Sequence, residues 1–342
     1  MLKGNVLSKK IVIHTLPVGH NIGGALQCIA LSEVVSRFGC EVKLLNYTPF
    51  WVFFKRKLKT FLGISIKIEM DGLENINLTK KIYFESCVRR YLLKNSVSLL
   101  LVGSDQVFRY SYLNNAKLYY SQIDIAPVKY ASYACSAGGA TLGLPSSYDA
   151  AEIFGMFDEI SIREASLKKD PWLKDKKTRV DLDPTLLLDA DFYRHSFSLS
   201  ENKNIVKKSV FSYILDPVTD LNIDSEFIVD SYNKSHGSLE SVPKISIKNW
   251  LNRLSQAQYV ITDSYHGMLF SIIFKKKFVV FPNHNRGLER FKEVIVKLGL
   301  PNDVISTNEK VVFQNIDWEL VEKKLSMEKN KSIEYLKSIV SL

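Results

Sequence analysis

Residues 259–282, YVITDSYHGMLFSIIFKKKFVVFP, place a cluster of polar side chains between two short β-branched runs. The first run, 259–262, resembles a buried strand and leads directly into Asp263-Ser264-Tyr265-His266-Gly267. An apolar segment of helical length and a second strand-like run, 278–281, follow. In open α/β sheets, ligands bind beyond the carboxyl ends of the strands, where such polar groups gather. The stretch therefore predicts a parallel α/β sheet with a ligand site at its polar turn.

The same strand, loop and helix pattern begins the chain and recurs along it. A strand-like run from Ile11 leads through a glycine-bearing loop into apolar residues at helical spacing, and EVKLLNY follows as the next strand. Further strands are predicted at 98–104, 130–136, 159–164, 178–184 and 209–215, and helices near 224–235, 248–257 and 316–340. A polar stretch between 185 and 208 marks a domain boundary. We predict two Rossmann-like domains, 1–190 and 191–342, the second ending in the C-terminal helix, with a ligand cleft between them.

Length, charge and cysteine content indicate which kind of protein this is and which kinds of partner it binds. The chain has 342 residues, which suits two domains. Its net charge of +10 favours an anionic partner, but no familiar nucleic-acid-binding motif is present, so a nucleic acid is not expected. The sequence has no apolar run long enough to span a membrane and no signal peptide. We therefore predict a cytoplasmic protein. The four cysteines form no CxxC pair and are interpreted as reduced core residues, with no metal site.

The segment PFWVFFKRKLKTFLGI, residues 49–64, interleaves aromatic and basic side chains. An interfacial helix on an anionic membrane has this composition. A core-facing helix with a solvated basic edge has it as well. The sequence leaves both interpretations open.

Two loops in the first domain carry candidate binding groups. VGHNIGGALQ places Asn21, Gly23 and Gly24 at the N-terminus of the first helix, where backbone N–H groups bind anions, although glycines there also allow close packing. This loop matches neither GxGxxG nor a P-loop, so it indicates neither NAD nor ATP. LLLVGSDQVFRYSY places Ser104, Asp105 and Gln106 after a strand, where a carboxylate binds sugar hydroxyls, acts as a base, or caps a helix.

Cationic side chains lie at the ends of two other predicted strands. Arg163, in SIREAS, offers a planar fork that matches carboxylate and phosphate. NHNRGLERF adds Asn283, Arg286 and Arg290 after the strand 278–281. Together with the His266 imidazole, these groups predict an anion pocket. DPTLLLD, residues 183–189, is interpreted as structural, with a turn at its Asp-Pro and packed leucines.

In this order, NIGGALQCIAL, GSDQVF, SIREAS, DPTLLL, IKNWLNRLSQAQYVITDSYHG and RGLERF resemble the polysaccharide pyruvyl transferase family. The resemblance covers about residues 11–300. It implies two Rossmann-like domains in a GT-B-like arrangement. It further implies phosphoenolpyruvate as donor and a pyruvate ketal on a sugar of a cell-surface polysaccharide, capsular or exopolysaccharide, as product.

The resemblance also assigns roles to individual residues. The family's motif histidine falls on His266, as a catalytic and donor-binding residue, and its arginine after the central strand falls on Arg163. Some members carry an arginine just before the motif histidine, whereas this chain has Asp263-Ser264-Tyr265, and Arg286 and Arg290 are expected to replace that cation. The predicted donor-binding set is Arg163, Ser264, Tyr265, His266, Gly267, Asn283, Arg286 and Arg290. The predicted acceptor-binding set, in the first domain, is Asn21, Gly23, Gly24, Ser104, Asp105 and Gln106, with Asp105 as the second catalytic residue.

Phosphoenolpyruvate is expected as a co-substrate, with no further cofactor and no metal. The acceptor sugar is expected on a polyprenyl diphosphate or nucleotide carrier, and segment 49–64 fits the former at the inner face of the cell membrane. Two other functions are open. One is a GT-B glycosyltransferase that uses a nucleotide sugar, and the other is a non-catalytic protein of the same fold that binds an acidic glycan.

Overall fold

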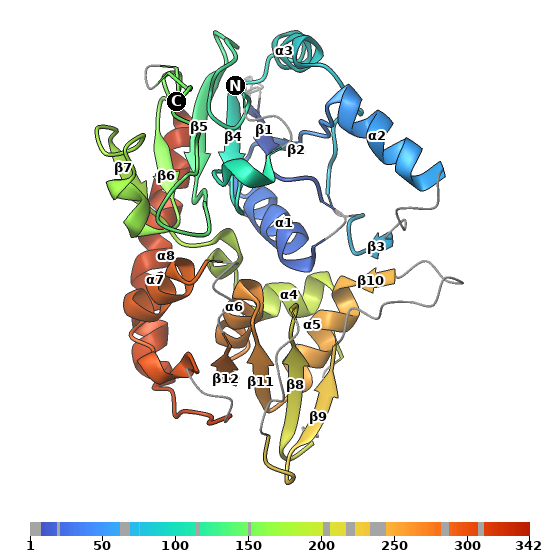
Figure 1. The fold of residues 1–342 in the computed structure, drawn as a ribbon, viewed down its shortest axis with the longest axis vertical. Coiled ribbons are helices and arrows are strands. Elements are labelled where there is room, and N and C mark those ends of the chain that lie inside the picture. The colour runs from blue at the N-terminus through green and yellow to red at the C-terminus, as the bar shows by residue number, and fades with distance from the viewer. Residues whose placement is uncertain are drawn as a thin grey trace, which may run out of the picture.

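The computed structural model describes residues 8–18, 21–61, 69–74, 76–113, 117–149, 152–200, 206–216, 223–232, 244–281, 287–306 and 311–342. Two four-stranded parallel sheets form its two halves, the first above the second in Figure 1. The predicted α/β class with parallel sheets is confirmed.

The first sheet has the order β2-β1-β4-β5. Its strands are β1 (Lys10–His14), β2 (Glu41–Leu44), β4 (Leu99–Gly103) and β5 (Lys129–Tyr133). Isolated parallel bridges continue it toward β6 (Ile160–Ile162), which pairs with β7 (Thr178–Val180). The central strand β4 is buried along its whole length, as expected for a parallel sheet covered on both faces.

The second sheet has the order β12-β11-β8-β9. Its strands are β8 (Ser209–Tyr213), β9 (Ile228–Ser231), β11 (Tyr259–Thr262) and β12 (Lys277–Val280). The predicted helix near 224–235 is wrong, because this segment contains β9. The β-branched Ile228 and Val229 pair in parallel with β8 and form the exposed edge of the sheet.

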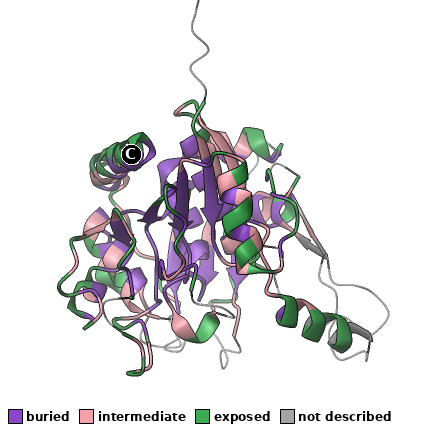
Figure 2. Cartoon of the chain, turned by 90° about the horizontal axis from the view of Figure 1, so that it is seen from above, coloured by how far each residue is buried: buried purple, intermediate pink, exposed green. Residues whose placement is uncertain are grey.

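Eight α-helices are described: α1 (Ile22–Ser36), α2 (Phe50–Phe61), α3 (Glu85–Lys94), α4 (Ala190–Ser196), α5 (Ile247–Gln256), α6 (Tyr265–Ile273), α7 (Glu289–Leu298) and α8 (Trp318–Ser341). Short 3-10 helices lie at Tyr110–Tyr112, Ala165–Lys169, Pro184–Leu187 and Asn302–Val304. Helix α1 is buried on most sides, since it packs both on the first sheet and on Pro184–Leu187. Figure 2 shows the strands and the helices against them as the buried interior.

Two features join the halves. Strand β3 (Glu69–Asp71) pairs in parallel with β10 (Lys244–Ser246). Helix α8 packs on α7 and then returns to the first sheet, where the Tyr335 hydroxyl donates to the Ser132 carbonyl at 2.9 Å. The C-terminal end of α8 is therefore at the top of Figure 1. The predicted boundary at residue 190 stays a prediction.

Helix α2 turns Phe50, Trp51 and Phe54 outward. Trp51 is 55% exposed and Phe54 60%, whereas Val52, on the opposite side, is buried. The interpretation of this segment as a core-facing helix is therefore wrong. None of the described helices combines the length and the apolar character that crossing a membrane requires.

Candidate active site

The turn between β11 and α6 is held rigidly by its own side chains. The Asp263 carboxylate accepts hydrogen bonds from the backbone N–H groups of Leu215 (2.8 Å) and Asp216 (3.0 Å), at the end of the adjacent strand β8. Ser264 caps α6 by accepting from the Gly267 N–H. A Cβ at Gly267 would lie 2.3 Å from Thr262 Oγ1, so glycine lets α6 begin directly against β11. His266 is thereby fixed in the first turn of α6, only 5% exposed.

The N-terminus of α1, from the other half of the molecule, lies directly against this histidine. Asn21 caps α1 by accepting from the Gly23 N–H at 3.1 Å. A Cβ at Gly23 would lie 2.0 Å from His266 Nδ1, and one at Gly24 would lie 3.1 Å from Asp105 Oδ2. The first turn of α1 therefore brings His266 and Asp105 to one place, although they follow strands of different sheets.

The segment after β4 is also constrained. Asp105 adopts a left-handed conformation, φ 67°, and its carboxylate accepts from the Gln106 N–H at 2.8 Å. Gln106 Oε1 accepts from the Arg109 guanidinium at 3.1 Å. Ser104 Oγ is hydrogen-bonded by Arg163 Nη2. Ser104, predicted on the acceptor side, is thus in contact with a predicted donor-binding arginine.

Asp183 is the site residue that the sequence interpretation missed. Its carboxylate accepts from the Thr185 N–H and hydroxyl, which shapes the expected turn. The same carboxylate lies 2.7 Å from Arg163 Nη2 and 3.5 Å from His266 Nε2, so in addition to shaping the expected turn it contacts two predicted site residues. Burial alone raises the pKa of the Asp183 carboxyl, but Arg163, His266 and Thr185 outweigh it and hold this pKa below its ordinary value.

Two arginines from different halves flank the Tyr265 ring. The guanidinium carbons of Arg163 and Arg290 lie 5.2 Å and 4.8 Å from its centroid. Burial and the neighbouring Arg163 lower the pKa of the Arg290 guanidinium. Helix α7 brings Arg290 to the first half, where Glu293 accepts from the Ala165 N–H at 3.1 Å.

Glu164 is a second group without a predicted role. Its side chain is fully buried and accepts a hydrogen bond from the Ser136 hydroxyl. Burial raises the pKa of the Glu164 carboxyl, against the opposing effects of Arg163 and of the Ser136 hydrogen bond. A buried carboxyl with a raised pKa beside arginine side chains is suited to proton transfer.

Several buried donors of this site have no hydrogen-bond partner in the described part of the chain. They are Arg163 Nε and Nη1, Arg290 Nε and the Tyr265 hydroxyl. Buried polar groups are normally satisfied, and guanidinium N–H groups match the oxygens of carboxylate and phosphate. The arrangement therefore fits a small anion between the two halves. Asn283 and Arg286, also predicted to bind the donor, lie outside the described residues.

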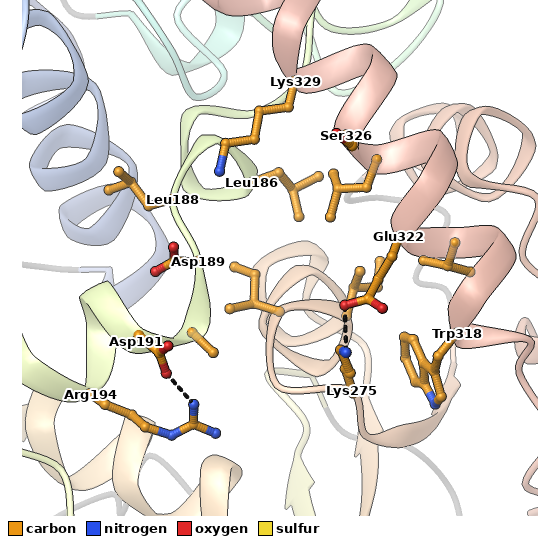
Figure 3. Close-up of a pocket in the computed structure, with 15 residues that line it drawn as sticks. Leu186, Leu188, Asp189, Asp191, Arg194, Lys275, Trp318, Glu322, Ser326 and Lys329 are labelled. Carbon is orange, nitrogen blue, oxygen red and sulfur yellow. Dashed lines mark hydrogen bonds and ion pairs between the residues drawn. The ribbon is translucent and has the colours of Figure 1, made fainter.

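A pocket of about 520 Å³ lies elsewhere, where the connection between the sheets meets α6 and α8 (Figure 3). Its floor is apolar and its rim carries two ion pairs, Arg194 with Asp191 and Lys275 with Glu322. None of the predicted site residues lines it. The predicted site residues Arg163 and His266 lie instead around Asp183.

Comparison with known proteins gives a family and a fold. The family model described as polysaccharide pyruvyl transferase matches residues 21–285, more than half of the chain. No curated protein sequence matches. Among solved structures, a UDP-N-acetylglucosamine 2-epimerase is similar at 11% identity and a TM-score of 0.50, covering 96% of this chain and 90% of that one.

Two further structures are 2-epimerases of the same kind. The Neisseria meningitidis UDP-GlcNAc 2-epimerase, bound to UDP-GlcNAc, is 10% identical with a TM-score of 0.48, covering 98% of this chain and 94% of its own. A Listeria monocytogenes putative UDP-N-acetylglucosamine 2-epimerase is 8% identical with a TM-score of 0.48, covering 96% and 90%. The match at a TM-score of 0.50 confirms the predicted GT-B-like fold of two Rossmann-like domains.

Proposed function

Because the chain belongs to the polysaccharide pyruvyl transferase family, we propose that it transfers the enolpyruvyl group of phosphoenolpyruvate to two hydroxyls of one sugar. The product is a pyruvate ketal in a capsular or extracellular polysaccharide. The observation that supports this donor is the pair of buried guanidiniums, Arg163 and Arg290, whose free N–H groups flank Tyr265. A molecule with both a phosphate and a carboxylate has an oxygen group for each of them.

The chemistry requires one proton to be delivered and two to be removed. Protonation of C3 makes C2 of the enol ether electrophilic, and the first sugar hydroxyl adds to C2 as it loses its proton. The bond from C2 to the phosphate oxygen then breaks. The second hydroxyl adds to C2 and loses its proton, which leaves with the phosphate. The products are the ketal and inorganic phosphate.

We assign these steps to the groups that the fold brings together. Asp105, beside the N-terminus of α1, orients or deprotonates the acceptor hydroxyl, with Asn21, Gly23, Gly24, Ser104 and Gln106 around it. His266 transfers a proton or stabilises the departing phosphate, and Asp183, 3.5 Å from its Nε2, orients the ring. Glu164 is a second proton-transfer group, since its raised pKa keeps it protonated to a higher pH.

We further propose that the acceptor sugar is presented on a polyprenyl diphosphate or a nucleotide carrier. The hydrogen-bond donors of the site are buried and few. They therefore suit the compact phosphoenolpyruvate molecule rather than the carrier of the acceptor sugar. The carrier is then held by surface elements of the first half, around the α1 N-terminus.

Ligand-induced stabilisation tests the donor. A ligand that binds only the folded protein raises its free energy of unfolding by about 2.7 kcal/mol at a hundredfold excess over Kd. Phosphoenolpyruvate is expected to raise the melting temperature, and UDP-GlcNAc at the same concentration is not. Stabilisation by UDP-GlcNAc alone would favour the glycosyltransferase alternative. A response to neither would favour the glycan-binding alternative.

Variants separate donor binding from folding. Arg290→Gln is expected to abolish the response to phosphoenolpyruvate, and Arg194→Gln, on the surface of α4, is its control. Arg163→Lys is preferable to Arg163→Ala, because removing the cation leaves the buried Asp183 carboxylate without its guanidinium partner at 2.7 Å. His266→Ala is expected to retain the fold and lose phosphate release from phosphoenolpyruvate in the presence of acceptor. Turnover near that of the wild type would exclude the role given to His266.

A further inference from the structure

Helix α2 presents a continuous apolar stripe to the outside of the molecule. Phe50, Trp51, Phe54 and Leu58 are between 48% and 60% exposed. At about 100° per residue these four positions fall within roughly 100° of the helix circumference. The opposite side holds the helix to the protein, through the buried Val52.

An aromatic residue outside the helix extends this stripe. Phe84, which is 53% exposed, stacks on Phe50 with ring centroids 5.5 Å apart and planes inclined by 18°. We call Phe50, Trp51, Phe54, Leu58 and Phe84 the aromatic face. A contiguous apolar patch of this kind, rimmed by polar groups, marks a contact surface for a partner or a membrane.

The surroundings of the aromatic face are basic. Lys55 and Lys57 are exposed, and helical spacing places them on opposite sides of the stripe. Lys80 and Lys81 are exposed on the segment before α3. Helix α2 has four basic residues in its sequence, FWVFFKRKLKTF, and no acidic one.

From these observations we propose that α2 lies in the headgroup layer of an anionic membrane, with the aromatic face inserted and the lysines on lipid phosphates. Interfacial helices combine an apolar face that carries Trp and Phe with Lys and Arg at its borders, and each basic residue near an anionic surface adds affinity. The lysine stems lie along the apolar surface while their ammonium groups reach the headgroups. A second copy of the chain fits less well, because a two-fold contact would bring the same basic rims together.

The position of α2 agrees with this orientation. The helix stands at the margin of the first half, away from both sheets (Figures 1 and 2). The α1 N-terminus and Asp105 belong to the same half. A membrane-bound α2 therefore holds the first half, which carries the proposed acceptor side of the site, at the bilayer.

Co-sedimentation of the full-length protein with vesicles tests the proposal without any substrate, so its result is independent of the proposed reaction. The wild type is expected to sediment with vesicles of equal phosphatidylcholine and phosphatidylglycerol, and not with phosphatidylcholine alone. Trp51→Ser combined with Phe54→Ser is expected to reduce binding at least tenfold. Val296→Ser combined with Ile228→Ser is the control, since these apolar side chains are 73% and 60% exposed elsewhere.

The basic rim has its own test. Lys55→Gln with Lys57→Gln is expected to weaken binding several-fold and to reduce its dependence on salt. Lys174→Gln with Lys177→Gln, two exposed lysines of the first half, leaves binding unchanged. Tryptophan emission is expected to shift to shorter wavelength on vesicle binding in the wild type but not in Trp51→Phe.

Three results would overturn the proposal. The first is a folded wild type that does not bind the anionic vesicles. The second is equal binding by the variant with serine at 51 and 54. The third is a dimer in gel filtration that this variant abolishes, because the aromatic face would then be covered by a second copy.

Discussion

Gly23→Ala tests the contact between α1 and His266, the proposed catalytic residue. The Cβ of the alanine would lie 2.0 Å from His266 Nδ1 and 2.4 Å from its Cγ. Ordinary van der Waals contact begins at 3.4 Å, so the imidazole has to retreat by about 1.4 Å, the difference between 3.4 Å and 2.0 Å. The backbone of α1 is buried on most sides and has little room to move instead.

Two opposing effects set the expected change in stability. Overpacking a close contact costs typically about 1–3 kcal/mol. Alanine in place of glycine in a helix returns at most about 1 kcal/mol. We expect the free energy of unfolding to fall by up to about 2 kcal/mol, which leaves a folded protein.

The effect on donor binding is expected to be larger than the effect on folding. A hydrogen bond to a charged group contributes about 1.5–3 kcal/mol, and a displacement above 1 Å removes it. The Kd for phosphoenolpyruvate, measured by calorimetry, is therefore expected to rise about tenfold to a hundredfold. Gly139→Ala is the matched control, because a Cβ there meets nothing within 4 Å.

A double-mutant cycle identifies the cause. Once His266→Ala has removed the ring, the methyl group at position 23 has space, and Gly23→Ala is expected to have little further effect on stability or affinity. Gly24→Ala, 3.1 Å from Asp105 Oδ2, is expected to leave phosphoenolpyruvate binding intact. Wild-type affinity in Gly23→Ala, or full additivity in the cycle, would refute the contact between α1 and His266.

Three further changes probe the charges and the packing around the site. Asp183 has a lowered pKa, so its contribution to the free energy of unfolding is present above an ordinary pKa near 4 and is lost as pH falls. In Asp183→Asn, urea unfolding should show a free energy of unfolding lower by about 3–5 kcal/mol at pH 7. This free energy should also decline less steeply in the variant below about pH 4. Glu164 has a raised pKa, so the wild type should lose stability as rising pH ionises this carboxyl, whereas Glu164→Gln should lack this decline. The variant should also release less phosphate from phosphoenolpyruvate. Identical profiles of stability against pH in the two proteins would argue against the raised pKa. Tyr335→Phe removes the bond from α8 to Ser132 and should cost about 0.5–1.5 kcal/mol in the same assay, and no change would mean that α8 is not seated through this bond.

The sequence predicted those helices and strands whose apolar side chains recur with a clear helical spacing or form a continuous run. The β-branched runs at β1 and β11, the apolar run at β4 and the apolar residues at helical spacing in α1 were all identified with small errors at their ends. The helix near 224–235 was wrong because β9 is a short edge strand, exposed along its length, and an exposed strand need not show buried periodicity. Helix α2 was identified, but which of its faces is buried depended on packing that the sequence does not display.

The site was only partly predictable for a similar reason. Polar residues at strand ends identified His266, Asp105 and Arg163 as candidates. The partners of these groups depend on which strands are neighbours, and Asp183 reaches Arg163 only because the segment after β7 passes beside the end of β6. Glu164 was not predicted as a site residue, because the functional interpretation of SIREAS was based on Arg163 alone. A carboxylate or carboxyl group directly after a predicted strand is the indication that could have suggested both.

Asp183 links the two halves of the molecule at the candidate site. One buried carboxylate contacts Arg163, which follows β6 in the first half, and His266, in the first turn of α6 in the second half. Its position in the connection between the sheets means that any rotation of one half against the other changes at least one of these two distances. Gly23 against His266 and Gly287 against Gly138 restrict the same rotation, because each pair leaves no room for a Cβ. Arg163, which we propose binds the donor, and His266, which we propose as the catalytic residue, therefore share Asp183 as a common contact, and a donor held by Arg163 would also be placed relative to His266.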